Sequence, residues 1–172
     1  VLWFGGGAMA ARLRDLVAPT EPGATLLLLS TFVGLAAGAF AAVAFVHGRA
    51  PGTLIGPARV ARRDFLRAVL VVAGVYVVMS LPWVVTWDGV PNLNFGTWVL
   101  LLPLSLAGVL VQTLSEELVF RGYLMQQLAA RFRSPMIWLL LPALGFGIVH
   151  YNPETNGANT WAVIAVVTCV GL

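Results

Sequence analysis

Charged side chains are scarce in this sequence. Asp, Glu, Lys and Arg make up 10% of its 172 residues, whereas 59% of the residues are hydrophobic. Soluble domains carry about 25% charged residues, so this chain has too little polar surface to cover a water-soluble globule. The composition therefore predicts an integral membrane protein that has the lipid bilayer as its surroundings.

Lysine is absent, and all ten basic residues are arginines. A net charge of +3 and a basic pI could suggest that the chain binds nucleic acid. The arginines, however, fall between apolar runs, where membrane topology explains them better. We expect no nucleic-acid partner.

Cysteine is nearly absent, and so are the usual zinc motifs. Cys169 is the single cysteine, which excludes a disulfide framework and a cysteine-based metal site. No His-Glu-x-x-His run occurs, which excludes the usual zincin arrangement.

Long apolar runs make up most of the sequence. Residues 25–46, 68–87 and 97–115 are uncharged, and two shorter runs follow at 135–149 and 160–172. About 20 helical residues cross a bilayer core about 30 Å thick, and a backbone in lipid must satisfy its own hydrogen bonds. We therefore predict an all-α, polytopic membrane bundle with about five transmembrane segments, the last of them truncated by the end of the sequence.

The connections between these runs predict the orientation of the chain. Residues 47–67 carry five arginines, 88–96 none, 122–134 two and 151–159 none. This alternation is typical of cytoplasmic and outer connections under the positive-inside rule. Arg12 and Arg14, before the first run, do not fit the alternation, and the place of the opening segment stays open.

Three charged residues extend the third apolar run without a turn signal: Glu116, Glu117 and Arg121. A charge at the centre of a membrane helix costs about 2.5–3.5 kcal/mol on insertion scales, so it is rarely placed there without a use. Glu117 and Arg121 are four residues apart and can form an ion pair. A simple cluster of interfacial ion pairs is the alternative interpretation, but it leaves Glu116 without a charged partner.

Glu116 is expected to face the protein interior. At 100° per residue it shares one helix face with Ser105, Gly108 and Gln112. Lipid offers such a polar stripe no partner, so this face is predicted to look toward other helices or a wet cavity.

His150 is predicted to lie at the level of Glu116. If the helices turn near 131–135 and the first stays continuous through Gly122, each residue lies about 23 Å from the turn. A carboxylate and an imidazole at one level can activate a water molecule. The two side chains could also contribute to a divalent metal site, such as zinc, and a second histidine would strengthen that hypothesis.

At these residues the sequence resembles a known family. The run 115–124, Ser-Glu-Glu-Leu-Val-Phe-Arg-Gly-Tyr-Leu, is similar to the first motif of the CPBP family, the CAAX proteases and bacteriocin-processing or immunity proteins. Phe146 and His150 match its second motif, Phe-x-x-x-His. The resemblance implies that Glu116 and His150 are the catalytic pair, and that Glu117, Arg121 and Phe146 support them. A third family motif on a later helix is not reached before Leu172, so the chain is expected to be a fragment.

The resemblance also sets the expected organisation and function. Residues 97–172 would be a partial CAAX-protease-like core and residues 1–96 a set of N-terminal membrane helices. The leading hypothesis is an intramembrane endopeptidase in the plasma membrane of a prokaryote, acting on a membrane-associated protein or peptide. A non-catalytic scaffold or immunity protein, and a transporter or proton relay using Glu116 and Arg121, are the alternatives. Whether the enzyme needs a metal stays open.

Overall fold

The protein is all-helical wherever its structure is described. A computed structural model describes residues 19–86, 90 and 92–172, and within these ranges it contains helices and connections but no strand. The predicted fold class is thus confirmed. Arg12 and Arg14 lie outside the described ranges.

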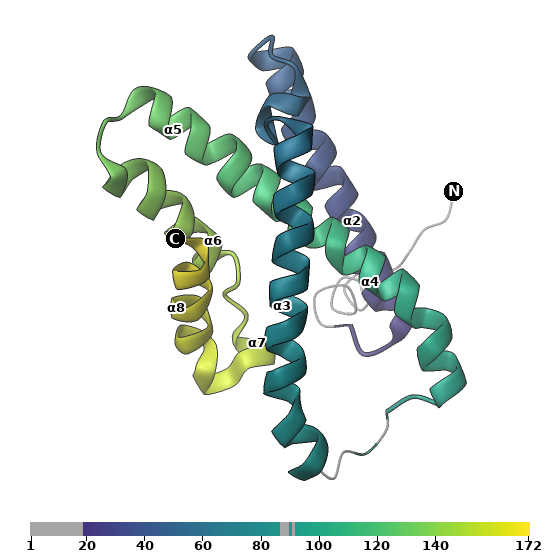
Figure 1. Ribbon diagram of the computed structural model, residues 1–172. Helices are drawn as coiled ribbons and strands as arrows, with labels where there is room; N and C mark the ends of the chain where they lie inside the picture. The colour runs from purple at the N-terminus through teal and green to yellow at the C-terminus, as the bar shows by residue number, and fades with distance from the viewer. Residues whose placement is uncertain (1–18, 87–89, 91) are drawn as a thin grey trace, which may run out of the picture.

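The elements follow one another along the chain with short connections (Figure 1). They are α2 (Pro22–Ala41), η1 (Ala42–Val46), η2 (Pro51–Leu54), α3 (Ala58–Thr86), α4 (Phe95–Glu117), η3 (Leu118–Leu124), α5 (Met125–Arg131), η4 (Met136–Leu140), α6 (Leu141–Ile148), α7 (Pro153–Asn156), η5 (Gly157–Asn159) and α8 (Thr160–Gly171).

Three of the resulting helices are long and apolar enough to cross a membrane: Pro22–Val46, Ala58–Thr86 and Phe95–Arg131. They correspond to the three long runs of the sequence. The two shorter runs form a pair of helical segments bent by 68° at residues 149–152, which counts as one broken span or a re-entrant loop. The described residues therefore contain three or four candidate spans rather than about five. The reason is length, because Met136–Ile148 rises only about 20 Å at 1.5 Å per residue.

The third span is one continuous helix of 37 residues. Its middle segment, η3, is π-helical and has a wider turn than the α-helix on either side. Gly122 lies in this segment against η2, where an added Cβ would be 3.3 Å from the Leu54 carbonyl oxygen. The continuity through Gly122 that the predicted hairpin requires is present.

The α2 and α4 helices pack against each other through small residues. Gly108 receives the side chain of Leu29, and a Cβ at Gly108 would lie 2.8 Å from Leu29 Cδ1. The fully buried Ser115 hydroxyl lies 2.9 Å from the Phe32 carbonyl oxygen on α2 and 2.6 Å from the Val111 carbonyl oxygen on its own helix. The close approach of the two helices is what the small, polar stripe of α4 predicts.

The basic connections gather at one end of the molecule. In Figure 1 the end of α2 and the turn after α5 lie at the top, whereas the C-terminal end of α3, the start of α4 and α7 lie at the bottom. Of the arginines in 47–67, Arg49 lies in the top connection and the other four lie on the first turns of α3, while Arg131 ends α5 and Arg133 lies in the turn after it. This arrangement agrees with the orientation predicted from loop charge.

The α6 and α8 helices form a hairpin with close backbone contact. Gly171 lies beside Ala143, where an added Cβ would be 3.1 Å from the Ala143 Cα. Gly147 lies against α8 at Ile164 and Thr168. Small residues at membrane helix interfaces permit this kind of approach.

Gly147→Ala should destabilise this hairpin. The added methyl group would overlap the Thr168 hydroxyl and lie 2.9 Å from the Ile164 carbonyl oxygen, so we expect a loss of about 1–3 kcal/mol. Gly145→Ala is the matched control, because its nearest neighbour would be Phe120 Cε1 at an ordinary 3.6 Å. Thermal unfolding in detergent measures both variants, and an equal midpoint for the two would contradict the packing described here.

Candidate active site

Glu116 lies on the last turn of α4, immediately before the π-helical segment. Its side chain is half-buried and lines a cavity of about 1090 Å³. Leu28 and Phe32 of α2 line the same cavity. The predicted polar face thus opens on a cavity that α2 also lines.

Gln112 is the polar partner of Glu116 within the described residues. It lies one turn earlier on the same face, and its Nε2 donates to Glu116 Oε1 over 3.4 Å. Glu116 therefore has an amide beside it, while the nearby cation pairs with Glu117. This separation is what distinguishes Glu116 from a simple ion-pair cluster.

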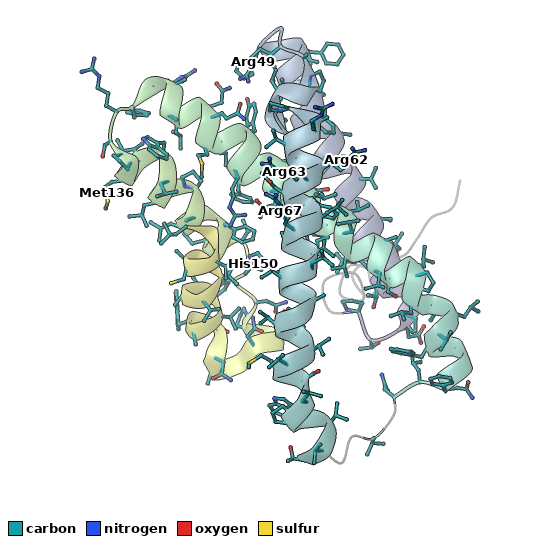
Figure 2. All side chains as sticks on the ribbon, in the orientation of Figure 1. Arg49, Arg62, Arg63, Arg67, Met136 and His150 are labelled. Atoms are coloured by element: carbon teal, nitrogen blue, oxygen red, sulfur yellow. The ribbon has the colours of Figure 1, made fainter. Side chains whose placement is uncertain are left out.

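His150 follows α6, and its ring is held by two contacts with that helix (Figure 2). Its Nδ1 lies 2.7 Å from the Phe146 carbonyl oxygen, and the Phe146 ring meets the imidazole edge-on at 4.9 Å. A carbonyl oxygen only accepts, so Nδ1 carries a proton and donates it to this bond. In the neutral ring Nε2 is then left with a free lone pair.

Glu116 and His150 line the same cavity from different helices. The carboxylate comes from α4, and the imidazole comes from the connection between α6 and α7, after the chain has turned at residues 132–135. The predicted antiparallel return therefore brings the two side chains to one hollow.

A polar wall of this cavity was missed by the sequence analysis. Asn152, Glu154, Thr155 and Asn156 line it from α7 and the residue before it. Asn152 accepts a hydrogen bond from the Thr155 backbone N–H at 3.1 Å and so caps this short helix. The cluster of Asn and Pro in 151–159 was the available signal, since an Asn before a Pro is a common helix start.

Arg121 holds the C-terminal hairpin against the third span. Its guanidinium donates to the Glu117 carboxylate and, through Nη2, to the Val170 carbonyl oxygen at 2.6 Å. Its Cζ also lies 5.7 Å from the centre of the Phe146 ring. The predicted ion pair is present, and its cation reaches both helices of the hairpin.

Glu117 and Arg121 border a separate cavity of about 520 Å³. This second hollow is lined mainly by apolar side chains, among them Phe40, Leu54 and Leu118. Neither Glu116 nor His150 lines it. The two predicted carboxylates therefore face different surroundings.

The described residues do not by themselves complete a metal site. Catalytic zinc sites take three protein ligands as a rule, and within the described ranges no group of three His, Cys, Asp or Glu side chains is placed to hold one ion. Glu116 and His150 are two such donors.

Comparison with known proteins finds a similar family for the part of the chain that contains Glu116 and His150. Residues 97–172 match the family described as Type II CAAX prenyl endopeptidase Rce1-like. This segment, less than half of the chain, is similar to that family. It begins near the start of α4 and runs through α8, so it contains both motifs and every predicted site residue.

A curated relative matches part of the chain. The uncharacterized protein YyaK of Bacillus subtilis (strain 168) is 37% identical over 76 residues, which are 44% of this chain and 25% of that protein. The chain thus spans about a quarter of the length of the relative that it matches. No solved structure matches the chain significantly.

Arg121→Lys should loosen α8 while keeping the charge. The ammonium group of lysine cannot replace the planar guanidinium group of Arg121, which donates to Glu117 and to the Val170 carbonyl oxygen at the same time. Loss of a charged hydrogen bond should speed amide exchange in α8 about tenfold or more. Hydrogen exchange followed by mass spectrometry measures it, with Arg131→Lys at the exposed end of α5 as control. Unchanged exchange in α8 would show that Arg121 does not hold the hairpin.

Proposed function

We propose that the protein is a membrane-embedded endopeptidase that hydrolyses a peptide bond of a membrane-associated protein or peptide. The observation that carries the proposal is the common cavity of Glu116 and His150 within an Rce1-like segment. Membership of a family of CAAX prenyl endopeptidases supports a peptidase. Because the family description names prenylated CAAX proteins, a lipid-modified substrate is the first to test.

The reaction follows from the two acceptors that border the cavity. Glu116 takes one proton from a water molecule, and His150 Nε2 accepts a hydrogen bond from the other and orients the water. The water oxygen bonds to the peptide carbonyl carbon, the C–N bond breaks, and Glu116 returns the proton to the leaving amine. A positioned base of this kind contributes about 10²–10⁴-fold to a rate.

The surroundings of the pair suit a substrate at the membrane. The cavity has apolar walls from α2 and η3, the polar Gln112 and Glu116 on α4, and the polar α7 segment on another side. A peptide could place apolar side chains against the apolar walls and its backbone amides against the α7 segment. We further propose that residues 97–172 form the catalytic core beside N-terminal membrane helices in 1–96, in the plasma membrane of a prokaryote, the relative being bacterial.

The placement of Arg121 argues against a proton relay through Glu116 and Arg121. The arginine borders the other cavity and is engaged by Glu117 and Val170. A relay would need the two groups along one polar path. A non-catalytic scaffold with the same fold is distinguished from the enzyme by the variants below.

Glu116→Gln should abolish most proteolysis, because the amide cannot accept the water proton. We expect a loss of about 10²-fold or more in kcat/KM for protein reconstituted in vesicles and given a library of prenylated and unmodified peptides, with cleavage products identified by mass spectrometry. Glu21→Gln is the control, as this exposed carboxylate lies just before α2 and does not line the cavity. Wild-type cleavage by Glu116→Gln would overturn the assignment of the base.

His150→Gln should lower kcat more than it raises KM. Glutamine keeps a polar group near the water but lacks the Nε2 acceptor that is fixed by the Phe146 carbonyl. We expect a fall in kcat of about 10²-fold. His47→Gln is the control, because His47 bonds Tyr123 away from this cavity. An equal loss in both variants would indicate damage to folding rather than to chemistry.

A further inference from the structure

A stripe of arginines runs along the first turns of α3 and takes no part in the proposed site. Its members, spaced i, i+3, i+4 and i+8, are Arg59, Arg62, Arg63 and Arg67. This spacing puts them within an arc of about 140° on one helix. All four are exposed, and Figure 2 labels three of them on α3. We call this set the Arg stripe.

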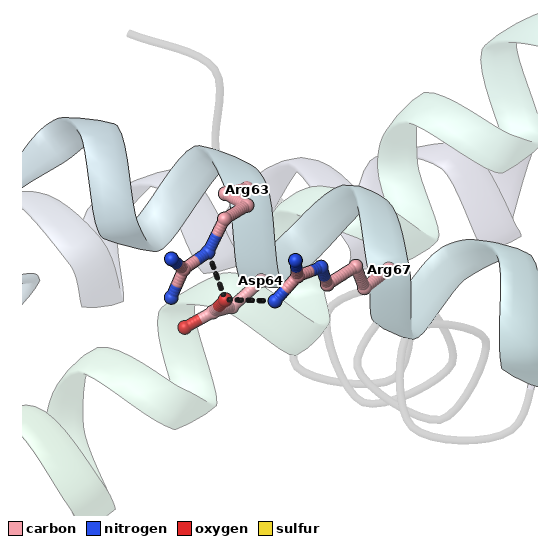
Figure 3. A network of polar contacts seen from close by, with 3 residues as sticks. All are labelled: Arg63, Asp64 and Arg67. Carbon is pink, nitrogen blue, oxygen red and sulfur yellow. Dashed lines mark hydrogen bonds and ion pairs between the residues drawn. The ribbon is translucent and has the colours of Figure 1, made fainter.

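Protein carboxylates neutralise the Arg stripe only in part. Asp64 Oδ1 lies 2.8 Å from Arg63 Nε and 3.8 Å from Arg67 Nη1 (Figure 3). The two arginine side chains remain 57% and 69% exposed. Within the described ranges no carboxylate pairs with the other two members of the stripe. A single carboxylate, that of Asp64, thus balances part of the charge of four guanidinium groups.

The apolar part of α3 fixes the depth of the stripe. Residues 68–86 carry no charge and rise about 28 Å, which is close to the thickness of a bilayer core. Arg67 then lies at the edge of the core, and Arg59 lies about 12 Å farther out. This interval is the headgroup region. α3 has no buried residue, so nothing in the described ranges covers the stripe.

We propose that the Arg stripe binds the headgroup phosphates of anionic phospholipids. A guanidinium group forms paired hydrogen bonds with phosphate and is more weakly hydrated than an ammonium. Anionic lipids attract basic segments next to membrane spans. An acidic protein could match the charge, but at this depth it would have to displace phosphates already present at the bilayer surface. Lipid is therefore the occupant that charge and depth together favour.

Native mass spectrometry of the full chain in detergent tests the proposal. The protein is titrated with phosphatidylglycerol and with phosphatidylcholine, and the preference for the anionic lipid is the readout. In the variant Arg59→Gln, Arg62→Gln, Arg63→Gln, Arg67→Gln this preference should fall about tenfold or more. The control is Arg131→Gln with Arg133→Gln, at an exposed turn of the same end, which should keep the preference.

Further variants separate the lipid from other partners. Four Arg→Lys changes keep the charge and should lose less than the Gln variant, and Gln is as good a helix former as Arg, so circular dichroism should show α3 intact. An unchanged preference in the Gln variant, or an equal loss in the control pair, would overturn the proposal. So would displacement of phosphatidylglycerol by an equal concentration of inorganic phosphate or of poly-glutamate, which would assign the stripe to a soluble anion or to an acidic protein.

Discussion

The guanidinium of Arg121 joins three parts of the Rce1-like segment. It pairs with Glu117 on the third span, donates to the last turn of α8 and lies over the Phe146 ring of α6. These contacts set the α6–α8 hairpin against the long helix. His150 is bound to the Phe146 carbonyl, so the position of the imidazole depends on the same attachment. The ion pair between these two partly buried charges thus also sets the position of His150.

The neighbouring carboxylates have different surroundings although they are adjacent in sequence. Glu117 forms an ion pair with Arg121, whereas Glu116 accepts a hydrogen bond from the Gln112 amide and lines a cavity. Successive residues of a helix point about 100° apart, so one helix can present a structural acid to one hollow and a free acid to another. The different surroundings of Glu116 and Glu117 thus follow from their adjacent positions on one helix.

Much of this arrangement could be predicted from residue patterns. Apolar length predicted the three long helices. Counting residues on both sides of the turn predicted Glu116 and His150 at one level, and the two side chains line one cavity. The bend at residues 149–152 and the cap by Asn152 were not predicted, because 151–159 was interpreted as a connection between apolar runs. The π-helical turn of Leu118–Leu124 was not predictable either, since a uniform 100° step was assumed. Such a turn depends on contacts between distant segments, here the fit of Gly122 against Leu54.

The lack of buried residues in α3 has a consequence for the way the protein meets membranes of different thickness. α2 and α4 pack together through Ser115 and Gly108, whereas no residue of α3 is buried. A mismatch between the apolar length of the helices and the thickness of the bilayer is then expected to tilt α3 more readily than the packed pair. A thinner bilayer would incline α3 further and leave the hollow between Glu116 and His150 undisturbed.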